Sequence, residues 1–356
     1  MSQVQGAHLV GSINFDDAET TMRVAAEHLG EHLRRIPDGE VGERFHWILF
    51  QADRIGQAAG IARVGDTPIP VRMLDVRPVR LADGVAAADI SLPPLGYAEA
   101  ALASWETFSR LKRDGVIAGG TRFQVSLPTP LGVVGSLVAA QDRAEFEPVY
   151  EAALAAELDQ ILAAIPHGEL AIPHGELAIQ WDAALEFAIL EGVTGRGAVR
   201  YEWFDDAWEG TSERLARQID RVPAGVEVGA HLCYGDVGEQ HFVEPADAAH
   251  LTRFANAVIA KARRELTWLH LPVPIGRDDE AFFAPLAELK LPDASELYLG
   301  LVHREDGAAG AERRIAAARA EVARDFGVAT ECGFGRAPEG TTVTLFETHR
   351  AVALAW

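Results

Sequence analysis

Eight short apolar runs alternate along the chain with longer stretches of helical period, and this alternation limits the fold more than any other feature. Good helix formers fill 16–33, 142–163, 246–264 and 308–325. Strands separated by helical crossovers pair in parallel, so eight of them predict one α/β domain over residues 1–356, a closed (β/α)8 TIM barrel. The runs that we predict as strands are 7–12, 34–38, 121–127, 177–181, 225–231, 266–270, 297–302 and 327–331.

The stretch from about 45 to 120 is too long for a single crossover. We predict that it is an insertion after strand two, with a helix at 96–113 and connections rich in Pro and Gly. No Gly-x-Gly-x-x-Gly follows the first strand, and the sequence contains no P-loop. An open nucleotide-binding sheet is therefore not supported.

One internal repeat is exact, because residues 164–170 and 171–177 both read AIPHGEL. We predict a local duplication held in a surface loop between the helix and the strand on either side. A metal-binding role for His167 and His174 is disfavoured, because two identical copies cannot occupy the same place relative to the barrel.

The charge balance excludes some classes of partner. The chain has 32 Lys+Arg against 53 Asp+Glu, a net charge of −21, which argues against binding to nucleic acid or to an anionic membrane surface. No apolar stretch approaches the roughly 18 residues of a membrane span, and the N-terminus has no signal-peptide features, so we expect a cytoplasmic protein. Two cysteines are too few for a disulfide scaffold.

Nearly every predicted strand ends in a polar or metal-binding side chain or is followed directly by one. In a parallel barrel all carboxyl ends of the strands open on one face, where active sites are assembled. We therefore expect these side chains to share a site. Along the chain they are Ser12, Asp38 with Glu40, Thr129, Asp182, His231 with Cys233, His270, His303, and Glu331 with Cys332.

The pair His231 and Cys233 lies two residues apart, which places both side chains on one face of an extended strand. The second cysteine, Cys332, follows another predicted strand. Two thiolates with one or two imidazoles form a donor set typical of zinc. Two unrelated buried thiols, or a redox pair, are the alternatives.

At these residues the sequence resembles the catalytic, C-terminal barrel of cobalamin-independent methionine synthase, within the superfamily that includes uroporphyrinogen decarboxylase. The resemblance implies a TIM barrel that binds Zn²⁺ and transfers a methyl or alkyl group to the zinc-bound thiol of a small, amino-acid-like substrate. The matching segments are GSI at 11–13, DGE at 38–40, LPTP at 127–130, IQWD at 179–182, HLCYGD at 231–236 and ECG at 331–333.

The resemblance also implies roles for single residues. His231, Cys233 and Cys332 match zinc ligands of the family. Glu40 and Asp182 match carboxylates that hold the substrate amino group. Ser12 matches a residue that contacts the substrate carboxylate.

This chain also departs from the family pattern. Where the family has a zinc-binding Glu after strand six, the chain has His270, which we predict as a fourth metal ligand. After strand seven it has His303-Arg304-Glu305-Asp306, and His303 is the candidate catalytic acid. The second barrel that helps to bind folate does not fit into 356 residues, so methyl-tetrahydrofolate is expected to be a poor donor.

Three alternatives remain open at this point: a metal-free, decarboxylase-like lyase, a zinc hydrolase, and a non-catalytic barrel with a structural zinc. The hydrolase is disfavoured because the chain has no His-x-His. The expected partners are a small-molecule thiol and an alkyl donor, with no nucleic acid and no membrane, and a homodimer is left open. Aromatic residues near the strand ends are candidates to line the pocket: Trp47, Trp181, Tyr234 and Phe334.

Overall fold

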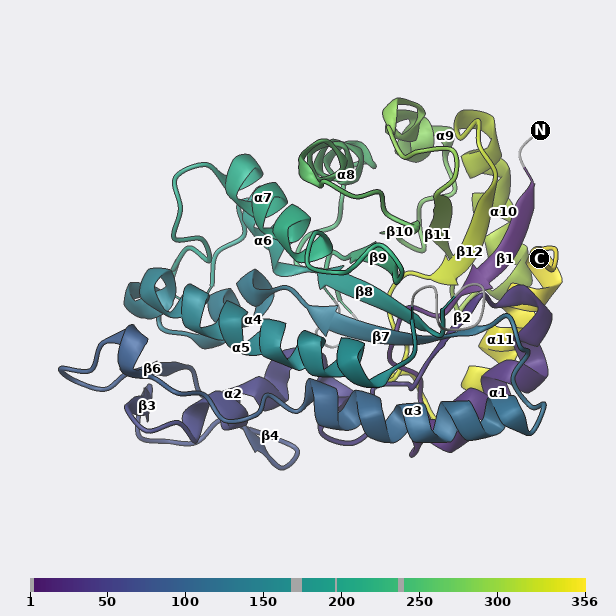
Figure 1. The fold of residues 1–356 in the computed structure, drawn as a ribbon. Coiled ribbons are helices and arrows are strands. Elements are labelled where there is room, and N and C mark those ends of the chain that lie inside the picture. Colours follow the sequence, from purple (N-terminus) through teal and green to yellow (C-terminus); the bar gives the residue numbers. More distant parts are fainter. Residues whose placement is uncertain (1–2, 168–174, 196, 236–239) are drawn as a thin grey trace.

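The chain folds around a sheet of eight parallel strands (Figure 1). The computed structural model describes residues 3–167, 175–195, 197–235 and 240–356. The strands lie side by side in the order β1-β12-β11-β10-β9-β8-β7-β2. Their bounds are β1 (Val4–His8), β2 (Arg35–Pro37), β7 (Arg122–Pro128), β8 (Leu177–Ala183), β9 (Glu227–Leu232), β10 (Trp268–Pro272), β11 (Glu296–Val302) and β12 (Phe326–Thr330).

The two ends of this order, β1 and β2, lie close to each other. Isolated parallel bridges pair Ala7 with Leu33 and Ser12 with Gly39, so the chain around β1 meets the chain around β2. The last helix packs against the first, which continues the outer layer of helices across the same place. The fold is therefore TIM-barrel-like, as the alternation of strands and helices predicts.

Helices connect the strands and cover the outer side of the sheet (Figure 1). Several begin at side chains that accept hydrogen bonds from the first turn: Asp17 Oδ1 accepts from the Thr20 amide at 2.8 Å, and Thr129 and Asp206 act in the same way. Within the described ranges, no helix has both the length and the apolar character needed to cross a membrane. The helix bounds are α1 (Ala18–Leu29), α3 (Tyr97–Arg113), α4 (Pro130–Leu137), α5 (Arg143–Ala164), α6 (Leu185–Leu190), α7 (Ala207–Ile219), α8 (Ala249–Lys261), α9 (Glu280–Phe283), α10 (Gly307–Glu321) and α11 (Thr342–Val352).

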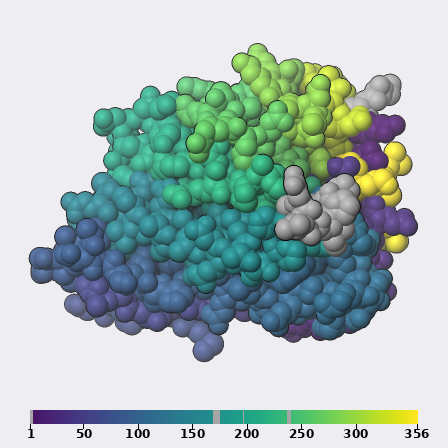
Figure 2. Space-filling model, in the orientation of Figure 1, coloured from purple at the N-terminus to yellow at the C-terminus, as the bar shows by residue number. Residues whose placement is uncertain are grey.

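The space-filling view from the same side shows the blue, teal and green parts of the chain following one another from bottom to top (Figure 2). Elements that are neighbours in sequence are thus neighbours in space, as βα units wound in one direction require.

The long connection between β2 and β7 has structure of its own. It runs through short helices and two small antiparallel pairs before it reaches α3, which matches the helix predicted at 96–113. Residues 45–49 of this connection line the cavity described below. The elements before α3 are η2 (Gly42–Leu49), α2 (Phe50–Gly56), β3 (Ile61–Arg63) paired with β6 (Val79–Leu81), β4 (Pro70–Val71) paired with β5 (Leu74–Asp75), and η3 (Ala87–Asp89).

The first predicted strand is displaced. β1 spans Val4–His8 rather than 7–12, whereas the ends of the other predicted strands fall within two residues of the observed ones. Residues after His8 leave the ladder because Ser12 turns toward other loops, where it pairs with Gly39 and accepts a backbone hydrogen bond from Phe334 at 2.8 Å. The polar end of this strand therefore remains on the expected face.

The tandem repeat connects α5 to β8, the place predicted for it. Residues 168–174, including His174, lie outside the described residues. On either side, Ile165 is buried and the Glu176 amide donates to the Pro166 carbonyl at 3.1 Å. The described flanks thus fit a loop that joins the helix to the strand.

A buried cation lies at the opposite, N-terminal end of the strands. The side chain of Arg35 is 1% exposed and donates to Glu227 at 2.6 Å and to Glu296 at 2.7 Å. Its guanidinium also stacks over Trp268, 4.1 Å from the ring centre. The guanidinium of Arg35 therefore offsets part of the charge of the two carboxylates at this end of the sheet, opposite the cysteines.

Candidate metal centre and cavity

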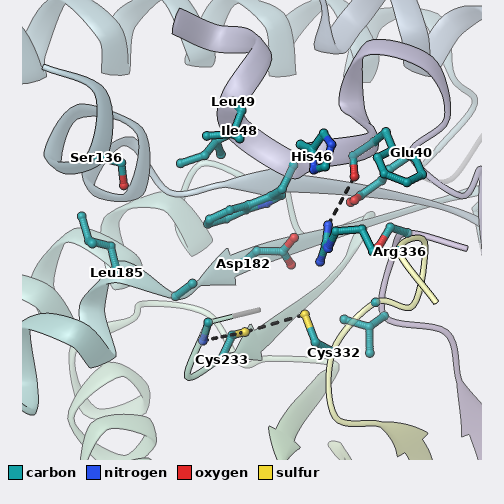
Figure 3. A pocket seen from close by; sticks show the side chains of 18 of the residues that line it. Glu40, His46, Ile48, Leu49, Ser136, Asp182, Leu185, Cys233, Cys332 and Arg336 are labelled. Carbon is teal, nitrogen blue, oxygen red and sulfur yellow. Dashed lines mark hydrogen bonds between the residues drawn. The ribbon is translucent and has the colours of Figure 1, made fainter. Parts of the chain in front are cut away.

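Two thiols and one imidazole meet at the carboxyl ends of β9 and β12. His231 is near the end of β9, Cys233 follows it, and Cys332 comes two residues after β12. The sulfur atoms of the two cysteines are 3.7 Å apart, much longer than a disulfide bond of about 2.05 Å. The ligand atoms of the three residues all lie within 4.8 Å of one another. Figure 3 shows the two cysteines side by side. The three-residue cluster predicted from the sequence is thus assembled.

The imidazole of His231 carries an unused nitrogen. Its Nδ1 lies 2.7 Å from Nδ1 of His270, but its buried Nε2 has no hydrogen-bond partner among the described residues. An unpaired buried nitrogen is costly unless a ligand satisfies it. With two sulfur donors beside it, this nitrogen completes a donor set that suits zinc.

His270 does not join the group as the predicted fourth ligand. It lies on β10 behind His231, fully buried, and its other ring nitrogen is 3.0 Å from the carbonyl oxygen of Thr330. Both ring nitrogens are therefore occupied by hydrogen bonds. Burial lowers the pKa of His270 to about 3 and that of His231 well below the usual value, so both rings are neutral.

His303 is not among the described residues that line the cavity. Its Nε2 lies 2.9 Å from the carbonyl oxygen of Val273, and burial lowers its pKa. A histidine that donates to a backbone carbonyl in this way is held as part of the framework. The predicted role of catalytic acid does not fit this geometry.

Two carboxylates face the same cavity as the thiols. Asp182 is in β8 and accepts from Gln180 Nε2 at 2.9 Å, and Glu40 follows β2. Burial raises the pKa of Glu40, and burial together with the nearby Glu40 raises the pKa of Asp182 well above its usual value. A cationic group bound between them would relieve both effects. The amine-holding role that the resemblance implies for these two carboxylates stays a prediction.

Asp38 of the same DGE segment supports the loop instead of facing the cavity. It pairs with Arg44 at 2.7 Å, accepts from the Ser104 hydroxyl at 2.8 Å, and accepts from the Glu40 amide at 3.0 Å. The last contact holds Glu40 at a φ of 52°, a left-handed conformation that costs a non-glycine residue free energy. Asp38 therefore helps to aim Glu40.

The cavity has a volume of about 800 Å³ and opens above the thiols. Ser12, Glu40, Asp182 and the three metal-site residues all line it. Glu40, Asp182 and the two cysteines are labelled in Figure 3. Much of the remaining wall is apolar or basic and comes from the connection after β2 and from later loops. These lining residues include Phe45, His46, Trp47, Ile48, Leu49, Val71, Arg72, Leu185, Tyr201, Phe242 and Arg336.

Sequence reasoning missed most of this wall. Of the four aromatics suggested, Trp47 lines the cavity, whereas Trp181, Tyr234 and Phe334 are buried in the core. Most of the missed residues lie in segments without a helical or strand period, so the sequence did not indicate which of their side chains would face the cavity. Three wall residues, Glu40, Trp47 and Arg72, have positive φ, and such strain often marks functional loops.

The loop that carries Cys332 is pressed against Ser12. A Cβ added at Gly333 would lie 2.9 Å from the Ser12 amide nitrogen and 3.2 Å from its carbonyl oxygen. Backbone atoms cannot move aside cheaply, so only glycine allows this approach. The Gly335 amide donates to the Ser12 hydroxyl at 3.3 Å, which adds to the contact.

Gly333→Ala is therefore expected to displace Cys332 and to lower the free energy of unfolding by about 1–3 kcal/mol, the usual range for overpacking. Zinc affinity should fall together with stability, and titration against a competing chelator measures it. The control is Gly276→Ala, because nothing lies within 4 Å of a Cβ there. Unchanged zinc affinity in Gly333→Ala would show that the close approach does not position the thiol.

The sequence matches no family model and no curated protein, so the comparisons rest on solved structures. A B12-independent methionine synthase from a Shewanella species, in complex with selenomethionine, aligns with a TM-score of 0.57 at 14% identity over 98% of this chain and 96% of that one. A putative vitamin-B12-independent methionine synthase from Listeria monocytogenes gives a TM-score of 0.57 at 16% identity, covering 98% of each chain.

A methyltransferase from Methanosarcina mazei aligns with a TM-score of 0.52 at 10% identity, over 99% of this chain and 94% of that one. These identities are low, and the likeness concerns the fold. The chain thus has the fold of these B12-independent methionine synthase and methyltransferase structures along nearly its whole length.

Proposed function

We propose that this protein is a zinc-dependent methyl- or alkyltransferase that acts on the thiol of a small, amino-acid-like substrate. The observation that carries the proposal is the buried Nε2 of His231, which has no hydrogen-bond partner in the described part of the chain, in a cluster with the thiols of Cys233 and Cys332. The names of the structures with the same fold support the same class of reaction.

In this proposal His231, Cys233 and Cys332 hold the metal ion. A zinc ion held by these residues would lower the pKa of a coordinated substrate thiol, so that the thiol would be a nucleophilic thiolate at neutral pH. Three protein ligands would leave one position for the substrate, as is usual in catalytic zinc sites. Free thiols have a pKa near 8.5, so without such help only a few per cent would be ionised at pH 7.

The side chains around the metal site bind and orient the substrate. In this proposal Glu40 and Asp182 accept hydrogen bonds from the substrate ammonium group, and Ser12, which lines the same cavity, contacts the substrate carboxylate. One of the structures with this fold was solved with selenomethionine, the selenium analogue of a methylated thiol amino acid. That ligand supports an amino-acid-like substrate here.

The remaining space suits the alkyl donor. A cavity of about 800 Å³ is larger than a thiol amino acid needs, and ligand pockets of this size hold drug-sized molecules. The wall from the connection after β2 would cover both reactants and exclude water. We propose that the chain is a single (β/α)8 domain and that this connection is an insertion after its second strand. We also propose that the protein is cytoplasmic.

The second candidate is the metal-free lyase, because Arg72 and Arg336 also line the cavity and cations are what substrate carboxylates require. That reading leaves the His231, Cys233 and Cys332 cluster without a purpose. The metal content of protein purified without chelator separates the two candidates.

The thiol is tested with cobalt in place of zinc. Homocysteine, cysteine or a simpler thiol added to the cobalt protein is expected to increase the sulfur-to-cobalt charge-transfer absorption, because a further sulfur ligand enters the site. Asp182→Asn should weaken the response to amino-acid thiols more than to thiols without an amine. A cobalt spectrum that no thiol changes would point to a closed, structural metal site and overturn the proposal.

A further inference from the structure

The hydrogen bonds behind His231 form a chain with a fixed direction. The Thr330 carbonyl oxygen can only accept, so the nitrogen of His270 that lies 3.0 Å from it must carry a proton. His270 is fully buried and forms no ion pair with any of the described residues, so its ring is neutral and has a lone pair on Nδ1, which lies 2.7 Å from Nδ1 of His231. His231 must therefore donate from Nδ1 and keep its lone pair on Nε2.

We infer that His270 is a positioning residue, which holds His231 in the one tautomer whose free Nε2 lone pair faces the two thiols. The inference rests on the metal site of the proposed function but concerns a residue outside the ligand set. In this role His270 neither binds the metal ion nor touches the substrate.

Rigid elements hold each member of this chain of hydrogen bonds. His270 and His231 are register partners on the neighbouring strands β10 and β9. Thr330 ends β12, and its hydroxyl donates to the Cys332 carbonyl at 2.6 Å. Thr330 therefore touches both sides of the site, since its carbonyl orders the imidazole pair and its hydroxyl orders the loop of Cys332.

The chemistry explains why an imidazole serves well at this position. Metal-bound histidines usually donate their second N–H to a carboxylate, a carbonyl or water, which fixes the ring and its tautomer. A neutral imidazole as acceptor adds no negative charge to a site that already has two thiols and two nearby carboxylates. A glutamine side chain also has an acceptor and a donor, so it can accept a hydrogen bond from His231 and donate one to the Thr330 carbonyl as His270 does.

The test uses nitrogen-15 NMR of histidine-labelled, metal-free protein, because the ring nitrogen shifts report the tautomer directly. The parent should show His231 protonated on Nδ1. His270→Gln should keep that tautomer, whereas His270→Leu should give the other tautomer or a mixture. His231 protonated on Nε2 in the parent, or an unchanged tautomer in a folded His270→Leu protein, would falsify the inference.

Zinc affinity is the second readout. His270→Leu is expected to bind zinc at least about tenfold more weakly, while His270→Gln stays within a fewfold of the parent. The packing control is His8→Leu, because the His8 ring lies 5.9 Å from that of His270 and bonds to Gln180 rather than to His231. This variant should lose stability and keep the His231 tautomer.

The two proposals fail separately. If the parent and variants show the expected tautomers but the protein binds no zinc, the inference about His270 stands and the proposed function fails. If zinc binds equally well to His270→Leu and to the parent, the positioning role fails and the metal site stands.

Discussion

Purified Cys332→Ser protein is expected to contain almost no zinc, against about one ion per chain in the parent. The serine hydroxyl does not ionise near neutral pH, and only His231 and Cys233 would remain to hold the metal. The loss in zinc affinity should exceed the roughly 100-fold upper range for changes outside the ligand set. Cys233→Ser should behave in the same way, because its sulfur lies 3.7 Å from that of Cys332.

Metal analysis after growth in zinc-replete medium measures the effect, and reactivity toward a thiol reagent gives an independent check, since bound zinc protects both cysteines. Ser136→Ala is the matched control, because Ser136 lines the same cavity on the side away from the sulfurs (Figure 3). It should keep the zinc content of the parent. Equal metal content in the parent and both cysteine variants would refute the proposed centre.

Arg35→Met is expected to lower the free energy of unfolding by about 3–5 kcal/mol, as is typical when one partner of a buried ion pair is removed. The change leaves Glu227 and Glu296 close together without their shared buried cation. Urea denaturation at pH 7 measures the loss. Arg34→Gln is the control: Arg34 also pairs with Glu296, but its side chain is 44% exposed, so the loss should stay below about 1 kcal/mol.

The acid sensitivity of the same cluster gives a second measurement. Burial alone would raise the pKa of Glu296, but Arg35 and Arg34 hold it at about 2. In the unfolded chain this carboxyl titrates near 4.3, so its stabilising contribution is full above that pH and is lost as the pH falls toward 2. In Arg35→Met this part of the pH dependence should flatten. A parent-like slope would show that other carboxylates dominate acid unfolding.

The sequence by itself determined the pattern of strands and helices and the residue types at the carboxyl ends of the strands. Apolar runs of strand length, spaced by helical stretches, leave few arrangements other than parallel strands with crossovers, and the observed β7 to β12 follow this pattern. Because parallel strands end on one face, residues far apart in sequence, such as Cys233 and Cys332, were predicted to meet, and they do. The type and bounds of each element follow from local periodicity, and the parallel direction follows from the helical crossovers between strands.

The direction of single side chains was decided only by tertiary structure. His231 and His270 are both the last residues of predicted strands. Among the described residues, Nε2 of His231 has no hydrogen-bond partner, whereas the two ring nitrogens of His270 bond to His231 and to Thr330. His303 is held by the Val273 carbonyl. The sequence gives the residue type and strand, but partners on other strands set the rotamer and the hydrogen-bond direction.

The cavity wall shows the same division. The sequence located an insertion after strand two, but Trp47 and Arg72 face the cavity through positive φ values that no periodic pattern encodes. Contacts from distant parts of the chain maintain such conformations, as the carboxylate of Asp38 does through Arg44, Ser104 and the Glu40 amide. Periodicity fixes which elements form, because it depends on burial of near neighbours. The shape of the site depends on contacts between residues far apart in sequence, which only the folded chain brings together.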